Sequence, residues 1–154
     1  MEIFLILLLI LLTAGSAFSS GSEVALFSLS PLKVKTYENS DNYRQRVVAQ
    51  LLSSPRDLLV TVFMLNTVVN ILLQNVASSL FQHTSGWTFK VGVPLILTLL
   101  IGEILPKYAA LRKNVDFALA VAPTVLFLQK MLASVRRWTI IITTPISRLM
   151  FFFL

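Results

Sequence analysis

The sequence predicts an all-α integral membrane protein, with three transmembrane helices and two further helices on the cytoplasmic side. Hydrophobic residues occupy 56% of the 154 positions and charged residues only 13%, whereas soluble domains carry about a quarter charged residues. Mean hydropathy is +0.80. The apolar residues form runs long enough to cross the ~30 Å hydrocarbon core of a bilayer. We therefore expect residues 1–154 to form one transmembrane domain in the inner cell membrane.

The first span is expected at about residues 3–32, where Glu23 is the only charged residue. Thirty residues of helix measure about 45 Å, which exceeds the hydrocarbon core, so this helix should tilt, protrude, or bend near Gly15 and Gly21. The N-terminus also resembles a secretory signal. Such signals begin with positive charge, whereas the first charge here is Glu2, so a retained span is favoured.

The second span is expected at about 58–82, after the helix-start pattern SSPRD, and the third at about 91–111. Basic residues gather in the first loop and after the third span: Lys33, Lys35, Arg44, Arg46, Arg56, Lys107, Arg112 and Lys113. Only Lys90 lies between the second and third spans. Because basic residues mark cytoplasmic loops, the N-terminus is expected outside.

The C-terminal part predicts two juxtamembrane helices, at about 116–133 and 136–152. Its first apolar piece is short and contains Pro123. If that piece crossed the membrane, the basic residues after it would lie outside, against the positive-inside rule. Helices in the cytoplasmic interface fit better, and four or five spans remain the alternative.

Polar residues from three spans are expected at one depth near the middle of the bilayer. At 1.5 Å per residue, Ser22 and Glu23 lie about 15–16 Å from the inner end of the first span. Asn66 and Asn70 lie about 14–20 Å into the second, and Glu103 about 18 Å into the third. Asn66 and Asn70 share one helix face through their i, i+4 spacing.

Backbone carbonyls are expected to join these side chains. Gly21 and Gly102 leave carbonyls approachable, and Pro106 cannot donate to the carbonyl of Gly102 one turn earlier. Carboxylate, amide, hydroxyl and carbonyl oxygens suit Mg²⁺, Ca²⁺ or Na⁺. The absence of cysteine and the single histidine, His83, argue against zinc or copper.

Alternatives to a cation site stay open at this stage. Serine and asparagine in spans often only hold helices together, and Glu103 could pair with Lys107 one turn later. No catalytic constellation is recognisable, so an enzyme is not expected. The basic residues show no patch with interleaved aromatics, so nucleic acid is not an expected partner.

Three pieces of the sequence resemble the transmembrane domain of the CorC/CNNM (cyclin M-like) magnesium transporters. They are SAFSSGSEVALFSLSPLKVK at 16–35, LNTVVNILLQNVAS at 65–78 and GEILPKYAALRKN at 102–114. Their order and spacing follow the family, and the resemblance covers essentially the whole chain. It implies three spans with an outside N-terminus, cytoplasmic juxtamembrane helices and a homodimer.

The resemblance also implies a function. Family members handle Mg²⁺, and bacterial members are associated with Mg²⁺ efflux driven by Na⁺ entry. The implied cation ligands are Ser20, Ser22, Asn66, Asn70, Gly102 and Glu103, followed by Ser16, Ser19 and Glu23. Cytosolic CBS domains, expected in the full-length protein, are absent from this chain, so ATP regulation is not assigned to it. The other functional hypotheses are a non-transporting membrane scaffold or magnesium sensor, and a cation channel.

Overall fold

The computed structural model describes residues 2–80 and 86–153, and every regular element within them is helical. The elements in chain order are α1 (Glu2–Phe27), α2 (Pro31–Glu38), α3 (Tyr43–Leu52), α4 (Pro55–Leu80), α5 (Trp87–Leu97), the π-helix η1 (Thr98–Ile104), α6 (Leu105–Arg112) and α7 (Asn114–Phe153). The predicted all-α class is confirmed.

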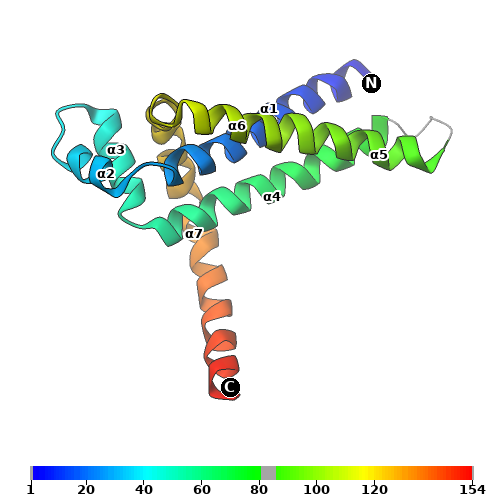
Figure 1. Ribbon diagram of the computed structural model, residues 1–154. Coiled ribbons are helices and arrows are strands. Elements are labelled where there is room, and N and C mark those ends of the chain that lie inside the picture. Colours follow the sequence, from blue (N-terminus) through cyan, green and yellow to red (C-terminus); the bar gives the residue numbers. More distant parts are fainter. Residues whose placement is uncertain (1, 81–85, 154) are drawn as a thin grey trace.

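Three long helical runs lie side by side (Figure 1): α1, α4, and the run formed by α5, η1 and α6. α1 contacts both of the other runs. α7 leaves this bundle crosswise, and its first part packs against α1, α3 and α4.

Four helical stretches of the described residues are long and apolar enough to cross a membrane: Glu2–Phe27, Pro55–Leu80, Val91–Arg112 and Asn114–Ala133. Length and composition therefore do not decide between three and four spans. The crosswise course of α7 in Figure 1 is the arrangement expected of a helix lying along the membrane surface. Three spans with an outside N-terminus remain a prediction.

The first helix ends at Phe27, five residues before the expected end of the first span at residue 32. Ser30 and Pro31 explain the difference, because together they start a new helix: the Ser30 side chain accepts from the backbone N–H of Lys33, and Pro31 occupies the first turn of α2. α1 is therefore 26 residues long, about 39 Å, and runs through Gly15 and Gly21 as one helix.

α7 is one continuous helix of 40 residues, where the sequence predicted two helices at about 116–133 and 136–152. Pro123 lies inside this helix and does not interrupt it. Ala118, Ala122 and Val125 are at most 1% exposed there. Burial of this apolar stripe offsets the backbone hydrogen bond that a proline removes.

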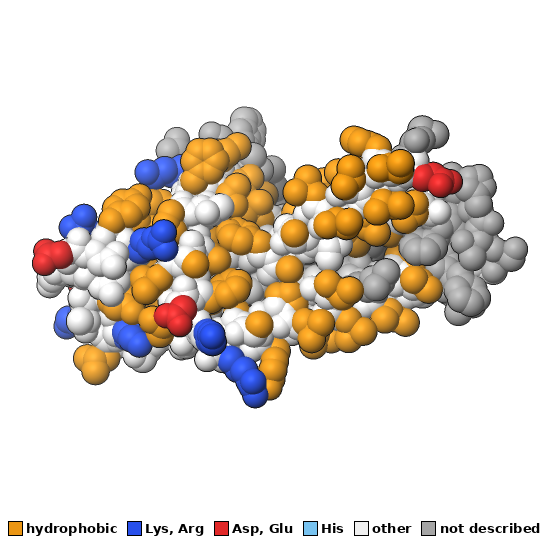
Figure 2. All heavy atoms as spheres, turned by 90° about the horizontal axis from the view of Figure 1, so that it is seen from above, with side chains coloured by type: hydrophobic (Ala, Val, Ile, Leu, Met, Phe, Trp, Pro, Cys, Tyr) orange, Lys and Arg blue, Asp and Glu red, His pale blue; other side chains and the backbone are white. Residues whose placement is uncertain are grey.

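The basic loop predicted after the first span folds into α2 and α3, which the sequence did not predict. Val48 and Leu51 of α3 are at most 1% exposed and belong to the main hydrophobic core, together with Leu26, Leu58 and Val125. Figure 2 shows Lys and Arg side chains gathered toward the end of the molecule that carries α2 and α3, while apolar side chains cover the opposite half. We call this the basic end of the bundle.

Candidate metal site

Three helices contribute to a connected set of polar groups, the polar cluster, formed by Ser16 of α1, Asn70 of α4, and Gly102 and Glu103 of η1. Ser16 Oγ lies 2.7 Å from Asn70 Oδ1 and 3.3 Å from the Gly102 carbonyl oxygen. Asn70 Nδ2 donates to Glu103 Oε1 over 2.8 Å. The structure thus brings together Asn70, Gly102 and Glu103, which belong to the first group of predicted ligands. It adds Ser16, which belongs to the second group.

A second polar contact lies one helical turn nearer the basic end. Ser20 Oγ donates to Asn66 Oδ1 over 3.3 Å. Ser16 and Ser20 on α1 thereby face Asn70 and Asn66 on α4, and each pair has i, i+4 spacing. The matched spacing on two helices was a signal in the sequence that would have ranked Ser16 with Ser20.

The local sequence explains why the Gly102 carbonyl can accept a hydrogen bond from another helix. Pro106 has no N–H, so it cannot give the carbonyl four residues earlier its α-helical hydrogen bond. The backbone adopts a π-helix just before it, over Thr98–Ile104, and π-helical turns occur frequently at functional sites. The Gly102 carbonyl instead accepts from the Ser16 hydroxyl.

Gly102 also allows α1 to approach closely. A Cβ at this position would lie 2.8 Å from Ser16 Oγ and 3.3 Å from Ser16 Cβ. Both distances are shorter than ordinary van der Waals contact, so a side chain here would push η1 away from α1. The absence of a side chain is therefore what permits the contact between Ser16 and the Gly102 carbonyl.

The polar cluster is buried on its α1 side and partly open elsewhere. Ser16 and Ser20 are 0% exposed, Gly102 is buried, and Asn66, Asn70 and Glu103 are half-buried. Buried hydroxyls with hydrogen-bond partners satisfy the requirement that polar groups away from water be paired.

Glu103 is the one carboxylate of the polar cluster. The pairing of Glu103 with Lys107, considered from the sequence, is not seen: Lys107 Nζ lies 3.9 Å from Glu23 Oε2 of α1 instead. Within the described part of the chain, no three histidine or acidic side chains meet in a metal-binding group. A cation at the cluster would therefore meet a single negative charge and several neutral oxygens.

Besides Ser20 and Asn66, three predicted residues make no hydrogen bond to the polar cluster within the described part of the chain. The Ser22 hydroxyl donates within its own helix, to the Phe18 carbonyl, over 2.6 Å. Ser19 is 4% exposed, and Glu23 forms the ion pair with Lys107. The sequence prediction counted depth from an inner end of the first span near residue 32, which placed Ser22 about 15–16 Å deep. Because α1 ends at Phe27, the residue about 16 Å from its inner end is Ser16.

The kinds of oxygen in the polar cluster suit a small octahedral cation. Mg²⁺ takes octahedral oxygen ligands at about 2.0–2.1 Å, so neighbouring ligand oxygens are about 2.9–3.0 Å apart. The distances from Ser16 Oγ to Asn70 Oδ1 and to the Gly102 oxygen, 2.7 and 3.3 Å, lie on either side of this value. For cation binding, the hydroxyl hydrogen of Ser16 must turn away from these two oxygens.

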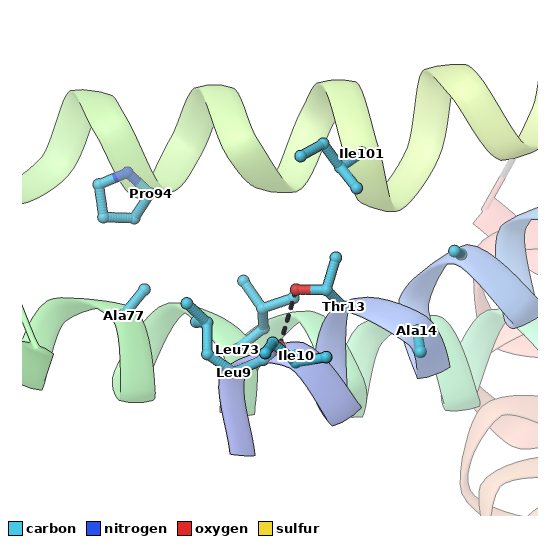
Figure 3. Close-up of a pocket in the computed structure, with 9 residues that line it drawn as sticks. Leu9, Ile10, Thr13, Ala14, Leu73, Ala77, Pro94 and Ile101 are labelled. Carbon is cyan, nitrogen blue, oxygen red and sulfur yellow. Dashed lines mark hydrogen bonds between the residues drawn. The ribbon is translucent and has the colours of Figure 1, made fainter. Parts of the chain in front are cut away.

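On the side away from the basic end, the polar cluster borders an apolar cavity of about 420 Å³. Its lining comes from α1, α4, α5 and η1 (Figure 3): Leu9, Ile10, Thr13, Ala14, Ala17, Leu73, Ala77, Pro94 and Ile101. The Thr13 hydroxyl donates to the Leu9 carbonyl, drawn as a dashed line in Figure 3. The lining therefore offers a cation almost no free oxygen.

The helical membrane fold agrees with the family comparison. The family model described as the cyclin M transmembrane N-terminal domain (CNNM) matches residues 6–152. The chain belongs to the CNNM family. This family is a transporter-type membrane domain associated with Mg²⁺ transport rather than an enzyme family.

One curated relative shows the same affiliation. A protein of Haemophilus influenzae described as a UPF0053 protein is 29% identical to this CNNM domain over 109 residues. The match covers 69% of this chain and 26% of the relative. The chain thus spans about a quarter of the length of the relative it matches.

Proposed function

We propose that this chain is the membrane domain of a Mg²⁺ transporter, which holds a largely dehydrated cation at the polar cluster. The main support is that a hydroxyl, an amide, a backbone carbonyl and a carboxylate from three helices meet in one hydrogen-bonded cluster, and their oxygens are of the kinds that Mg²⁺ takes as ligands. Glu103 supplies the charge in this proposal, and Ser16, Asn70 and Gly102 supply neutral oxygens.

Ser20 and Asn66 provide a second step for the ion, one turn nearer the basic end. Of the other predicted ligands, Ser22 and Ser19 support the packing of α1 in this proposal, and Glu23 acts outside the cluster. Mg²⁺ gives up its waters reluctantly and usually keeps several. One carboxylate and a few neutral oxygens therefore suit an ion that must also leave.

We further infer the direction and setting of transport. The proposed activity is Mg²⁺ efflux coupled to Na⁺ entry, by a homodimer in the inner cell membrane. The basic end faces the cytoplasm under the positive-inside rule, and cytosolic CBS domains belong to the full-length protein. One charge moving through 100 mV yields about 2.3 kcal/mol, so inward Na⁺ movement can drive Mg²⁺ outward.

Mg²⁺ binding to the purified protein tests the site. Glu103→Gln removes the only charge of the cluster and should abolish measurable Mg²⁺-dependent thermal stabilisation. Asn70→Ala removes the hydrogen bond to the carboxylate and should raise the Kd by about 10- to 150-fold, since a hydrogen bond to a charged group contributes about 1.5–3 kcal/mol.

Asn75→Ala is the matched control for Asn70→Ala. Asn75 lies on the same helix and is exposed, and its Nδ2 donates only to the Ile71 carbonyl of α4. The control should leave the Kd within about twofold of the unmodified protein. Mg²⁺ affinity that survives Glu103→Gln would refute the proposed site.

Flux in proteoliposomes tests the function. A carrier coupled to Na⁺ should move Mg²⁺ against its gradient when Na⁺ is supplied on the opposite side, with a saturating rate. The interhelical hydrogen bonds of the cluster also fit a scaffold or a sensor. Mg²⁺ binding without flux would indicate a sensor, neither binding nor flux a scaffold, and non-saturating flux without Na⁺ a channel.

A further inference from the structure

An ion pair joins α1 to α6 close to the polar cluster. Lys107 Nζ lies 3.9 Å from Glu23 Oε2, and the two side chains are 40% and 36% exposed. Neither residue belongs to the cluster itself. Both side chains therefore lie in a partly hydrated place next to the proposed cation site.

The sequence spacing places this pair between the polar cluster and the basic end. Lys107 follows Glu103 by one helical turn, about 6 Å along the axis, and Glu23 follows Ser20 by about 4–5 Å. Both steps lead in the same direction, toward the ends of α1 and α6. On the opposite side of the cluster lies the apolar cavity, and an ion that enters from the basic end passes the ion pair on its way to the cluster.

The geometry is that of a loose contact. Charge-assisted hydrogen bonds between ammonium and carboxylate groups measure about 2.7–2.9 Å, which is well below the 3.9 Å seen here. Exposed pairs of this kind add little to stability. A pair at this distance opens easily, and a divalent cation competes strongly with one ammonium group for the carboxylate.

We propose that Glu23 and Lys107 form an entry latch for the cation, on the side of the basic end. Glu23 is the last carboxylate that a Mg²⁺ arriving from the basic end passes before the polar cluster, and the Lys107 ammonium occupies it until the ion displaces it. Lys107 then repels further cations from the loaded cluster. This inference rests on the proposed transport function and adds two residues to its path.

The latch predicts opposite effects of neutralising its two members, measured as Mg²⁺ flux in proteoliposomes with Mg²⁺ supplied at the basic end. Glu23→Gln should raise the KM for Mg²⁺ about tenfold at unchanged maximal rate, because an attractive charge is lost. Lys107→Gln should lower the KM several-fold, because a repulsive charge is lost. Both shifts should shrink in 0.5 M KCl, since salt screens partly exposed charges.

Matched variants separate the latch from a general change of charge. Glu38→Gln and Lys113→Gln make the same charge changes at exposed positions on α2 and after α6, and should leave the KM within about twofold. Glu23→Asp and Lys107→Arg keep the charges and should stay near the KM of the unmodified protein. Lys107→Met, which keeps the apolar stem, replaces Lys107→Gln if that variant does not fold.

A pair that merely braces α1 against α6 would respond differently. Both neutralising changes would then shift the KM or the maximal rate in the same direction, or not at all, and either result overturns the latch. Failure of the proposed function is distinguishable, because the unmodified protein would then carry no Mg²⁺ or Glu103→Gln would bind it normally.

Discussion

Replacing Gly102 with alanine tests how closely α1 must approach η1. The new Cβ would lie 2.8 Å from Ser16 Oγ, whereas ordinary van der Waals contact begins near 3.4 Å. The two helices must therefore separate by about 0.6 Å, or the Ser16 side chain must turn. Turning gives incomplete relief, because Ser16 Cβ itself would lie at 3.3 Å.

The expected cost follows from this overlap. Overpacking of a well-packed interior costs about 1–3 kcal/mol, which corresponds to about 5- to 150-fold in affinity if it falls on the bound state. Gly102→Ala should accordingly raise the Kd for Mg²⁺ at least fivefold, measured by calorimetric titration of the purified protein. Binding with a Kd within twofold of the unmodified protein would refute the role given to this contact.

Gly15→Ala is the control for Gly102→Ala. A Cβ at Gly15 would lie 3.5 Å from Val69 Cγ1, an ordinary contact, so this change should leave Mg²⁺ binding intact and keep or raise stability. Adding Ser16→Gly to Gly102→Ala removes the overlapping atoms and should restore the thermal stability. It should not restore Mg²⁺ binding, because the Ser16 hydroxyl is lost as well.

Three further predictions concern neighbouring positions. Ser16→Ala should weaken Mg²⁺ binding about tenfold in titration, and Ser22→Ala less than twofold, because the Ser22 hydroxyl donates within its own helix; equal losses would contradict this ranking. Pro106→Ala supplies an N–H to the carbonyl one turn earlier and should weaken Mg²⁺ binding while raising thermal stability, so unchanged affinity would argue against the freed carbonyl. Gly21→Ala puts a Cβ 2.8 Å from the Phe117 ring and should lower the thermal stability by about 1–3 kcal/mol; Phe117→Ala in the same chain should relieve this overlap, and additive losses in the double variant would show that the two residues do not collide.

The sequence by itself determined the class of the protein and the candidate polar groups. Long apolar runs with few charges leave only membrane-spanning helices as a fold, because lipid cannot satisfy the backbone of other structures. The loss of the α-helical hydrogen bond to the Gly102 carbonyl is also a local property, since Pro106 lacks a donor whatever surrounds it. Asn66 and Asn70 share a face through helix geometry alone.

The tertiary structure decided which of these groups meet. Ser16 and Ser22 are both 0% exposed serines of α1, yet only Ser16 bonds to α4 and η1. The two residues point to different sides of α1, and packing decides which side faces these helices. Lys107 could reach Glu103 by helical spacing, but packing of α6 on α1 gives it Glu23 instead.

Tertiary packing likewise keeps α7 helical through Pro123, which local propensity alone would disfavour. Hydrophobicity and backbone chemistry act along the chain and can be read from it residue by residue. The partner of a hydroxyl or an ammonium group depends on the rotation and end point of each helix, and these are set by contacts between segments far apart in the sequence.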